Sequence, residues 1–289
     1  MANCGVVNST VIRLFLLIYS VVKQSRVKKT SHPVILTIAG SDPCCGAGLQ
    51  ADIRVASAIG CYATSVTTAL TAQNTTGVYE VWPLSPHQVA EQGRVLLDDI
   101  VPCAVKVGMI ATEEVAAVVT DMVNALPNVS VVVDTILRST SGKPLLTTNG
   151  TGAFERLMSS ARIITPNLPE AEVLLLGERL MVEEIPEALS SRFGGVSVYL
   201  KGGHGTGDLV TDLFYNAESG TLLKLEAARV DTLNTHGTGC CLSTALACYL
   251  AHGCQLDVAV RKAHEFTHKA LEGGCGFVLG AGHGPTFSF

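Results

Sequence analysis

The sequence predicts an α/β domain built around a mostly parallel sheet, and three observations support this fold class. Of its 289 residues, 47% are hydrophobic and only 16% are charged. The mean hydropathy of +0.37 is typical of strands that are buried on both faces. Short apolar β-rich runs alternate with helical patterns from residue 34 to the end. This composition excludes a disordered chain and a coiled coil.

The elements follow in chain order from these patterns. The apolar runs predict buried strands at 34–39, 62–70, 104–107, 129–133, 162–165 and 196–200. Helical patterns predict helices at 49–59, 86–98, 112–125, 239–252 and 256–271. Gly60 is placed to end the first helix, and Thr112 to cap the third. Two β-rich runs at 208–215 and 221–225 flank Gly220 and predict a hairpin.

Residues 1–32 differ from the rest and are expected to be a dispensable extension of a single domain over 33–289. They hold five bases and no acid, so the remainder carries 15 bases and 25 acids. A body this acidic is not expected to bind nucleic acid. The apolar run at 14–22 is shorter than the roughly 20 residues of a membrane span, and its bases follow it, unlike those of a signal peptide.

The ten cysteines indicate a reduced compartment. Their spacing fits no disulfide framework, and C-x-x-C is absent from the sequence. We therefore expect a cytoplasmic protein that needs no membrane.

Polar residues follow several of the predicted strands. Asp42 comes after the first strand, Asp134 ends a later one, and Asn167 and Glu170 form an N-x-x-E after the next. Lys201 follows a fourth strand. Because the carboxyl ends of parallel strands meet at one edge of a sheet, these groups are expected to lie together. Phosphoryl transfer needs such a set: oxygens for a metal, and a lysine for phosphates.

The segment NTHGTGCC at 234–241 leads directly into an apolar helix. Gly237 and Gly239 allow a tight turn, and the free N–H groups of Gly237, Thr238, Gly239 and Cys240 would form an anion hole at the helix start. Cys240 lies where a helix lowers the pKa of a thiol, so it could accept a proton from an attacking hydroxyl.

Two familiar patterns carry no site in this interpretation. HEFTH at 264–268 matches the H-E-x-x-H of zinc proteases, but a clear third ligand is missing. GAGLQA at 46–51 matches a dinucleotide-binding loop, yet no acidic residue follows from 55 to 79. We expect a packed or solvated histidine pair in the first case.

Several ordered motifs together resemble one family. They include LTIAGSDP, GAGLQAD, TALTAQNTTGV, KVGMI, SGKPLL, TPNLPEAEVLL, KGGHGTG and NTHGTGC. In this order they resemble the hydroxymethylpyrimidine/phosphomethylpyrimidine kinases of thiamine biosynthesis, in the ribokinase-like superfamily. The resemblance implies a three-layer α/β/α sandwich, ATP and Mg²⁺ as cofactors, a small pyrimidine substrate phosphorylated twice, and a homodimer.

The resemblance also implies roles for single residues. Gln73 would hydrogen-bond the aminopyrimidine, Gly40 and Asp42 would line its pocket, and Met109 would pack on the ring. On the nucleotide side, the residues implied to hold Mg²⁺ and phosphates are Asn167, Glu170, Lys201 and Asp134. Gly237, Thr238, Gly239 and Cys240 would form the anion hole, with Cys240 where sugar kinases of the superfamily carry an aspartate base.

The chain departs from the family pattern at two places. Cys44 and Cys45 stand in the first loop where the family has Ser and Gly, and the D-x-V-M pattern becomes DTIL at 134–137, followed by Arg138. Two other functions stay open: a pyridoxal kinase of the same superfamily, and a pyrimidine-binding module without catalysis.

Overall fold

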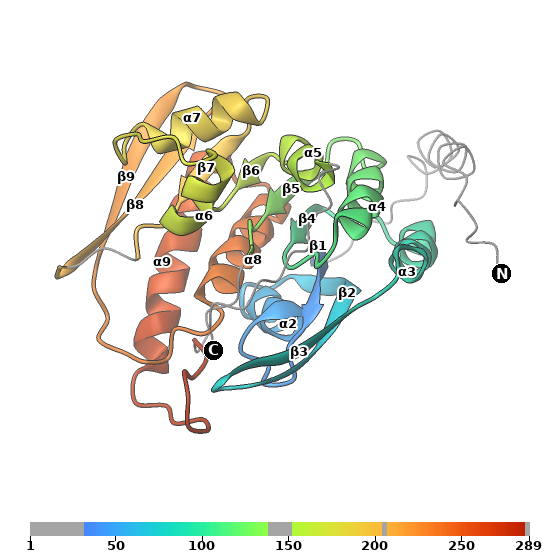
Figure 1. Cartoon of the computed structure of the whole chain (residues 1–289), viewed down its shortest axis with the longest axis horizontal. Helices are drawn as coiled ribbons and strands as arrows, with labels where there is room; N and C mark the ends of the chain where they lie inside the picture. Colours follow the sequence, from blue (N-terminus) through green and yellow to red (C-terminus); the bar gives the residue numbers. More distant parts are fainter. Residues whose placement is uncertain (1–31, 138–151, 204–206, 287–289) are drawn as a thin grey trace.

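One nine-stranded sheet organises the part of the chain that the computed structural model describes, namely residues 32–137, 152–203 and 207–286. The strand order is β3-β2-β1-β4-β5-β6-β7-β8-β9 (Figure 1). The six central strands β2, β1, β4, β5, β6 and β7 run parallel. Strand β3 at one edge and strands β8 and β9 at the other pair antiparallel. This confirms the predicted α/β class.

The strands and helices have the following bounds. The strands are β1 Val34–Ser41, β2 Tyr62–Asn74, β3 Gly77–Pro83, β4 Ala104–Val107, β5 Ser130–Val133, β6 Ile163–Ile164, β7 Ser197–Leu200, β8 Leu209–Asn216 and β9 Thr221–Ala228. The helices are α2 Gly48–Ala58, α3 Pro86–Asp99, α4 Glu113–Asn124, α5 Ala153–Ser159, α6 Leu168–Leu174, α7 Ile185–Arg192, α8 Thr238–Ala251 and α9 Leu256–Gly274.

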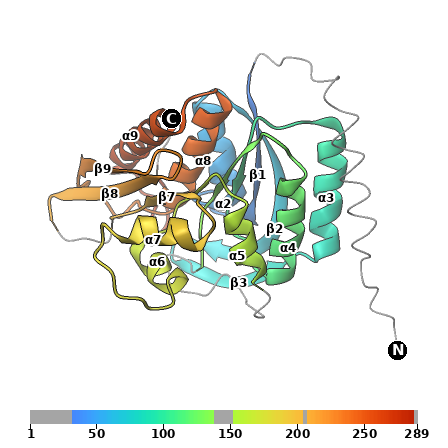
Figure 2. The ribbon, with the colours of Figure 1, turned by 90° about the horizontal axis from the view of Figure 1, so that it is seen from above.

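Alternating side chains of the sheet feed two separate hydrophobic cores. In β1, Leu36 and Ile38 pack on one face with residues of α3, α4, α5 and α7. Ile35 packs on the other face with residues of α2, α8 and α9. Figure 2 shows these two helical layers on opposite sides of the strands. The arrangement is the three-layer sandwich that the resemblance implies.

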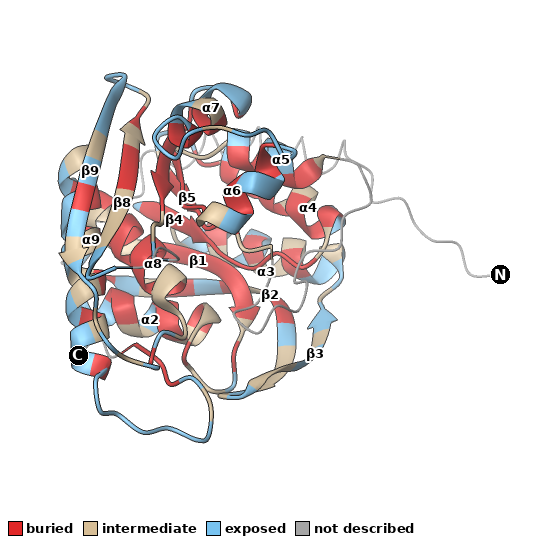
Figure 3. Ribbon diagram, turned by 60° about the vertical axis from the view of Figure 1, so that its left-hand side comes forward, coloured by how far each residue is buried: buried red, intermediate tan, exposed pale blue. Residues whose placement is uncertain are grey.

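Helix α8 is the most deeply buried of the helices that contact the site. Its residues are buried on nearly all faces, and it packs on α2 and α9 as well as on the strands (Figure 3). A helix that is apolar all round belongs inside a domain. Its N-terminus is therefore held rigidly at the edge of the sheet.

Most predicted elements are confirmed, and a few short ones were not expected. The Thr112 cap is present, since its hydroxyl accepts from the N–H of Val115 at 3.2 Å. Strand β3 and the helices α5, α6 and α7 were missed. Each helix has only seven or eight residues, too few for a periodic pattern, and β3 lies exposed at the sheet edge. The motif SGKPLL and residues 1–31 lie outside the described residues.

Among the helices of the described residues, none is long and apolar enough to cross a membrane. The boundary of the domain near residue 32 stays a prediction.

Removal of residues 1–31 is expected to leave the fold intact, because residues 32–286 supply the sheet and both helical layers. The thermal unfolding midpoint should change by less than about 2 °C, corresponding to under about 1 kcal/mol. Calorimetry of the full and shortened chains checks this. Loss of solubility in the shortened chain would contradict it.

Candidate functional site

A cavity of about 1120 Å³ opens at the carboxyl ends of the parallel strands. It is lined by all twelve residues that the sequence placed in the site: Gly40, Asp42, Gln73, Met109, Asp134, Asn167, Glu170, Lys201, Gly237, Thr238, Gly239 and Cys240. This edge of an α/β sheet is where ligands bind. The expected convergence is confirmed, and the roles of the residues stay predictions.

The start of α8 stands at the centre of this cavity because Gly237 has no side chain. Gly237 has a φ of +81°, and a Cβ there would lie 1.9 Å from the carbonyl oxygen of Gly46. Gly239 lies near two charged groups, since a Cβ there would lie 3.3 Å from Asp134 Oδ2 and 3.4 Å from Lys201 Nζ. The first-turn N–H groups thus lie beside a lysine, which suits a phosphate group.

Three charged side chains lie together at the end of the site that the sequence predicts for the nucleotide. Lys201 Nζ lies 3.0 Å from Asp134 Oδ1 and 3.8 Å from Glu170 Oε2. Burial alone would raise the pKa of Asp134, but Lys201 and Lys106 lower it below its ordinary value. Burial raises the pKa of Glu170, although Lys201 opposes this. The charged form of Asp134 is therefore favoured, whereas burial disfavours the negative charge of Glu170 and a nearby cation would stabilise it.

The N-x-x-E pattern is a capping box of α6. Asn167 Oδ1 accepts the N–H of Glu170 at 2.8 Å, and Glu170 Oε2 accepts the N–H of Asn167 at 2.9 Å. Thr135 also donates to Glu170 Oε2, at 3.1 Å. Asn167 is neutral and its one side-chain oxygen already accepts a bond, whereas Glu170 has a second carboxylate oxygen, Oε1, and can carry a negative charge. Glu170 is therefore the better cation ligand of the two.

A cage of three or more His, Cys, Asp or Glu side chains does not occur within the described residues. Mg²⁺ does not need one, because it is usually bound by one or two carboxylates together with substrate phosphates and water. Glu170, which lies 3.8 Å from Lys201, fits that pattern.

The prediction of a lowered pKa at Cys240 is wrong. The side chain is only 5% exposed, and burial raises the pKa of its thiol to about 11. Lys106 opposes the rise, while Asp52 and Asp134 add to it. The loss of hydration outweighs the opposing charge of Lys106, so the group present at neutral pH is the thiol.

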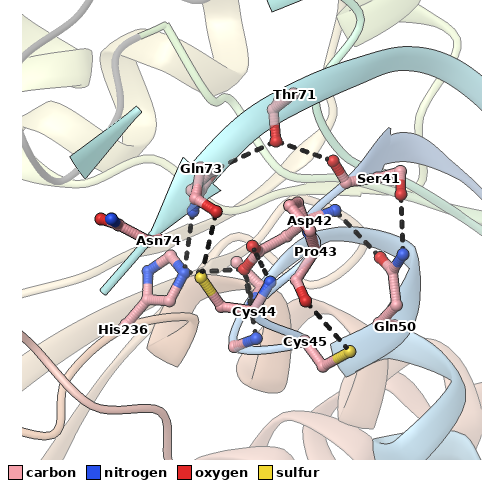
Figure 4. A network of polar contacts seen from close by, with 12 residues as sticks. Ser41, Asp42, Pro43, Cys44, Cys45, Gln50, Thr71, Gln73, Asn74 and His236 are labelled. Atoms are coloured by element: carbon pink, nitrogen blue, oxygen red, sulfur yellow. Dashed lines mark hydrogen bonds and ion pairs between the residues drawn. The ribbon is translucent and has the colours of Figure 1, made fainter. Parts of the chain in front are cut away.

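The loop after β1 is organised by Asp42 (Figure 4). Its carboxylate accepts the N–H groups of Cys44, Gly46 and Ala47 at 2.9–3.1 Å. Burial by itself would raise the pKa of Asp42, but bonds from His236 and from these backbone groups lower it below its ordinary value. Asp42 therefore shapes the loop that faces the cavity.

His236 joins this loop to Gln73 and was not among the predicted site residues. Its Nε2 lies 2.8 Å from Asp42 Oδ2 and 3.0 Å from Gln73 Nε2 (Figure 4). A carboxylate can only accept, so His236 Nε2 carries the proton donated to Asp42. Because His236 Nε2 carries this proton, it cannot accept a hydrogen bond from the amide nitrogen of Gln73. The N–H groups of the Gln73 amide are therefore available to a ring nitrogen of a ligand.

Cys44 closes the same network. Its thiol donates to the carbonyl oxygen of Gln73 at 3.5 Å, and burial followed by the charge of Asp42 raises its pKa to about 11. Cys44 therefore acts as a neutral hydrogen-bond donor that ties the first loop to the end of β2.

The H-E-x-x-H helix has a structural use. His264 Nδ1 lies 2.8 Å from the hydroxyl of Tyr199 and 3.2 Å from Asp212. Asp212 in turn accepts the N–H of Gly202, next to Lys201, at 2.7 Å. The histidine thus anchors the turn that carries Lys201.

A buried ion pair beneath the site was also missed. Lys106 Nζ lies 2.8 Å from Asp52 Oδ2, and both side chains are 0% exposed. The signal was present in the sequence, since Lys106 is a lone charge in the apolar strand AVKV.

Comparisons with known proteins agree with this geometry. The family model described as phosphomethylpyrimidine kinase matches residues 42–287. A hydroxymethylpyrimidine/phosphomethylpyrimidine kinase of Rhizobium meliloti is 40% identical over 261 residues, covering 89% of this chain and 97% of the relative.

Two solved structures are similar over most of the chain. Pyridoxal kinase from Staphylococcus aureus in complex with ADP gives a TM-score of 0.78 at 29% identity, covering 89% of this chain and 93% of that one. Phosphomethylpyrimidine kinase from Clostridium difficile gives 0.69 at 34% identity, covering 83% and 99%.

Gly237→Ala tests how tightly α8 is seated. The matched control is Gly253→Ala, where φ is +83° but nothing lies within 4 Å of the added Cβ. The control should lose about 1–2 kcal/mol of unfolding free energy from backbone strain alone. Gly237→Ala should lose at least about 1 kcal/mol more. Urea unfolding measures both, and equal losses would contradict the contact with Gly46.

Proposed function

Since the chain belongs to the phosphomethylpyrimidine kinase family, we propose that it transfers the γ-phosphoryl group of ATP to 4-amino-5-hydroxymethyl-2-methylpyrimidine. A second transfer to the resulting monophosphate gives the diphosphate. The product supplies the pyrimidine half of thiamine. The protein is thus a kinase of thiamine biosynthesis.

One observation carries this proposal. The start of α8 lies between two chemically different halves of a single cavity. In one half, Gly239 lies beside Lys201 and Asp134, which suit phosphates. In the other half, Gly237 contacts Gly46 in the loop that contains Asp42, and Gln73 lines the same part of the cavity. A phosphate donor in one half and a nitrogen heterocycle in the other would meet at the anion hole.

The substrate half is suited to an aminopyrimidine. Gln73 offers amide N–H groups to a ring nitrogen, and its amide oxygen can accept from an exocyclic amine. Met109 is 8% exposed and packs with Ala69 and Ala111, and a Cβ on Gly40 would lie 3.1 Å from its Cε. The absence of a side chain at Gly40 therefore leaves room for the methionine to cover a flat ring.

The nucleotide half would hold Mg²⁺ on Glu170, with the phosphates completing its coordination. The ion would neutralise charge on the transferred phosphoryl group. Lys201 would give up part of its contact with Asp134 and Glu170 and bind a phosphate instead. The first-turn N–H groups of α8 would stabilise the phosphoryl group during its transfer.

Pyridoxal is the second candidate substrate, because a pyridoxal kinase of the same fold is among the similar structures. Purified protein with ATP is supplied with each acceptor in parallel, and products are weighed by mass spectrometry. We expect a doubly phosphorylated pyrimidine as the main product. If neither acceptor is phosphorylated, a pyrimidine-binding module without catalysis becomes the better interpretation.

Gln73→Leu is expected to raise KM for the pyrimidine about ten- to a hundredfold, because the polar groups of the bound ring would lose the partner that the half-buried Gln73 supplies. Its effect on pyridoxal should be smaller. Equal losses for both acceptors would indicate a packing defect instead of lost recognition.

Glu170→Gln is expected to raise the Mg²⁺ concentration for half-maximal rate at least about tenfold, since a charged ligand is lost. Glutamine can keep the capping box, so the fold should survive. Glu178→Gln, on the exposed end of the same segment, is the matched control. An unchanged Mg²⁺ dependence would refute the assignment.

The pH dependence of the two transfers should differ. With the pKa of Cys240 at about 11, its thiolate fraction rises with pH throughout the neutral range. If the thiolate removes the alcohol proton, the first transfer should accelerate about tenfold per pH unit between pH 7 and 9. The second should stay nearly flat, because the phosphate acceptor, with a pKa of about 6, is already ionised.

Initial rates with each acceptor provide this measurement, and Cys240→Ala should remove the slope of the first transfer. A flat profile in the unaltered enzyme would mean that the thiol is not the base. The expected homodimer remains a prediction, which light scattering tests.

A further inference from the structure

A charged pair lies beneath the transfer site without contacting the cavity. Lys106 Nζ donates to both oxygens of Asp52, at 2.9 and 2.8 Å. The same carboxylate accepts the hydroxyls of Thr37 at 2.5 Å and Thr244 at 2.7 Å. A buried ion pair is often no more stabilising than apolar residues of equal volume. Stability alone therefore does not account for it.

The position of the pair connects it to the start of α8. Thr244 lies four residues after Cys240, so the two share one face of the helix. Lys106 is close to the strand end that leads to Met109, because a Cβ on Gly108 would lie 2.8 Å from Lys106 Nζ. The ammonium is thus fixed between the helix that carries the thiol and a strand that lines the cavity.

Charges of alternating sign continue from this pair into the site. The charge of Lys106 helps to lower the pKa of Asp134 and opposes the rise that burial causes in the pKa of Cys240. Asp134 pairs with Lys201 at 3.0 Å, and Lys201 lies 3.8 Å from Glu170. The charged groups around Cys240 are Asp52 from α2, Lys106 from β4, Asp134 after β5 and Lys201 after β7.

We propose that Lys106 is a positioning residue for the first phosphoryl transfer, in which its ammonium, held by Asp52, balances negative charge on Cys240 and Asp134. The inference rests on the proposed function. In that step the alcohol proton passes to the thiolate of Cys240, and the alcohol oxygen bonds to the γ-phosphorus. The bond from the γ-phosphorus to the bridging oxygen breaks, and its electron pair leaves with ADP.

The second transfer needs this support less. Its acceptor is a phosphate oxygen that has no proton to lose, so no thiolate is required at Cys240. Loss of the Lys106 charge should therefore affect the two transfers unequally, which a general packing defect would not do.

The test uses the double variant Lys106→Met with Asp52→Asn in the full chain. Removing both charges avoids leaving a single buried ion, which is strongly destabilising. We expect kcat of the first transfer to fall about ten- to a hundredfold, which is part of the roughly 10²–10⁴-fold that a positioned general base contributes. The second transfer should stay within about threefold. Lys106 affects the pKa of Cys240 more than Asp52 does, so the rising pH profile of the first transfer should move to higher pH when both charges are removed.

Thr244→Val is the milder variant, because it removes only the hydroxyl bond to Asp52. Like the double variant, it should lower the ratio of the first transfer rate to the second. Thr120→Val is its matched control, since that hydroxyl bonds Ala116 within α4, away from the cavity. If the double variant does not fold, the ratio in Thr244→Val decides.

An unchanged ratio in Thr244→Val and in a folded double variant would overturn the proposal, as would equal losses in both transfers. Failure of the unaltered enzyme to phosphorylate either pyrimidine would instead refute the proposed function. The two failures are therefore distinguishable.

Discussion

The contact between Lys106 and Asp52 joins four elements whose ends form the cavity. Asp52 belongs to α2 and Lys106 to β4, while the hydroxyls that complete the bonds come from Thr37 in β1 and Thr244 in α8. A charge taken out of water must be paired to be tolerated. These bonds fix how far each of the four elements extends along the strand direction relative to the others. The loops that follow β1 and β4 and the start of α8 therefore meet at one edge of the sheet.

The centre of the sheet could be predicted because its strands are short apolar runs separated by helical patterns. The antiparallel edge strand β3 could not, because its pairing with β2 depends on a turn at 75–76 and its side chains are largely exposed. Helices α5, α6 and α7 have too few turns for periodicity to identify them. Their positions are set by packing on the sheet.

The site could be predicted as a set because strand ends converge, whereas its electrostatics could not. The pKa of Cys240 depends on burial by segments far away in the sequence, so the helix-start pattern gave the wrong direction. His236 was missed for a similar reason, since its partner Asp42 lies 194 residues earlier. The N-x-x-E pair shows that one motif can both cap a helix and line the cavity.

The seating of Gly237 against Gly46 has a consequence for synthesis on the ribosome. The first loop leaves the ribosome long before α8, and the two surfaces that must touch are separated by most of the chain. Contacts so distant in sequence form late and slowly. A nascent chain can therefore complete its early strands before the cavity is closed, because the part of its wall that α8 supplies forms only once the C-terminal helices have docked.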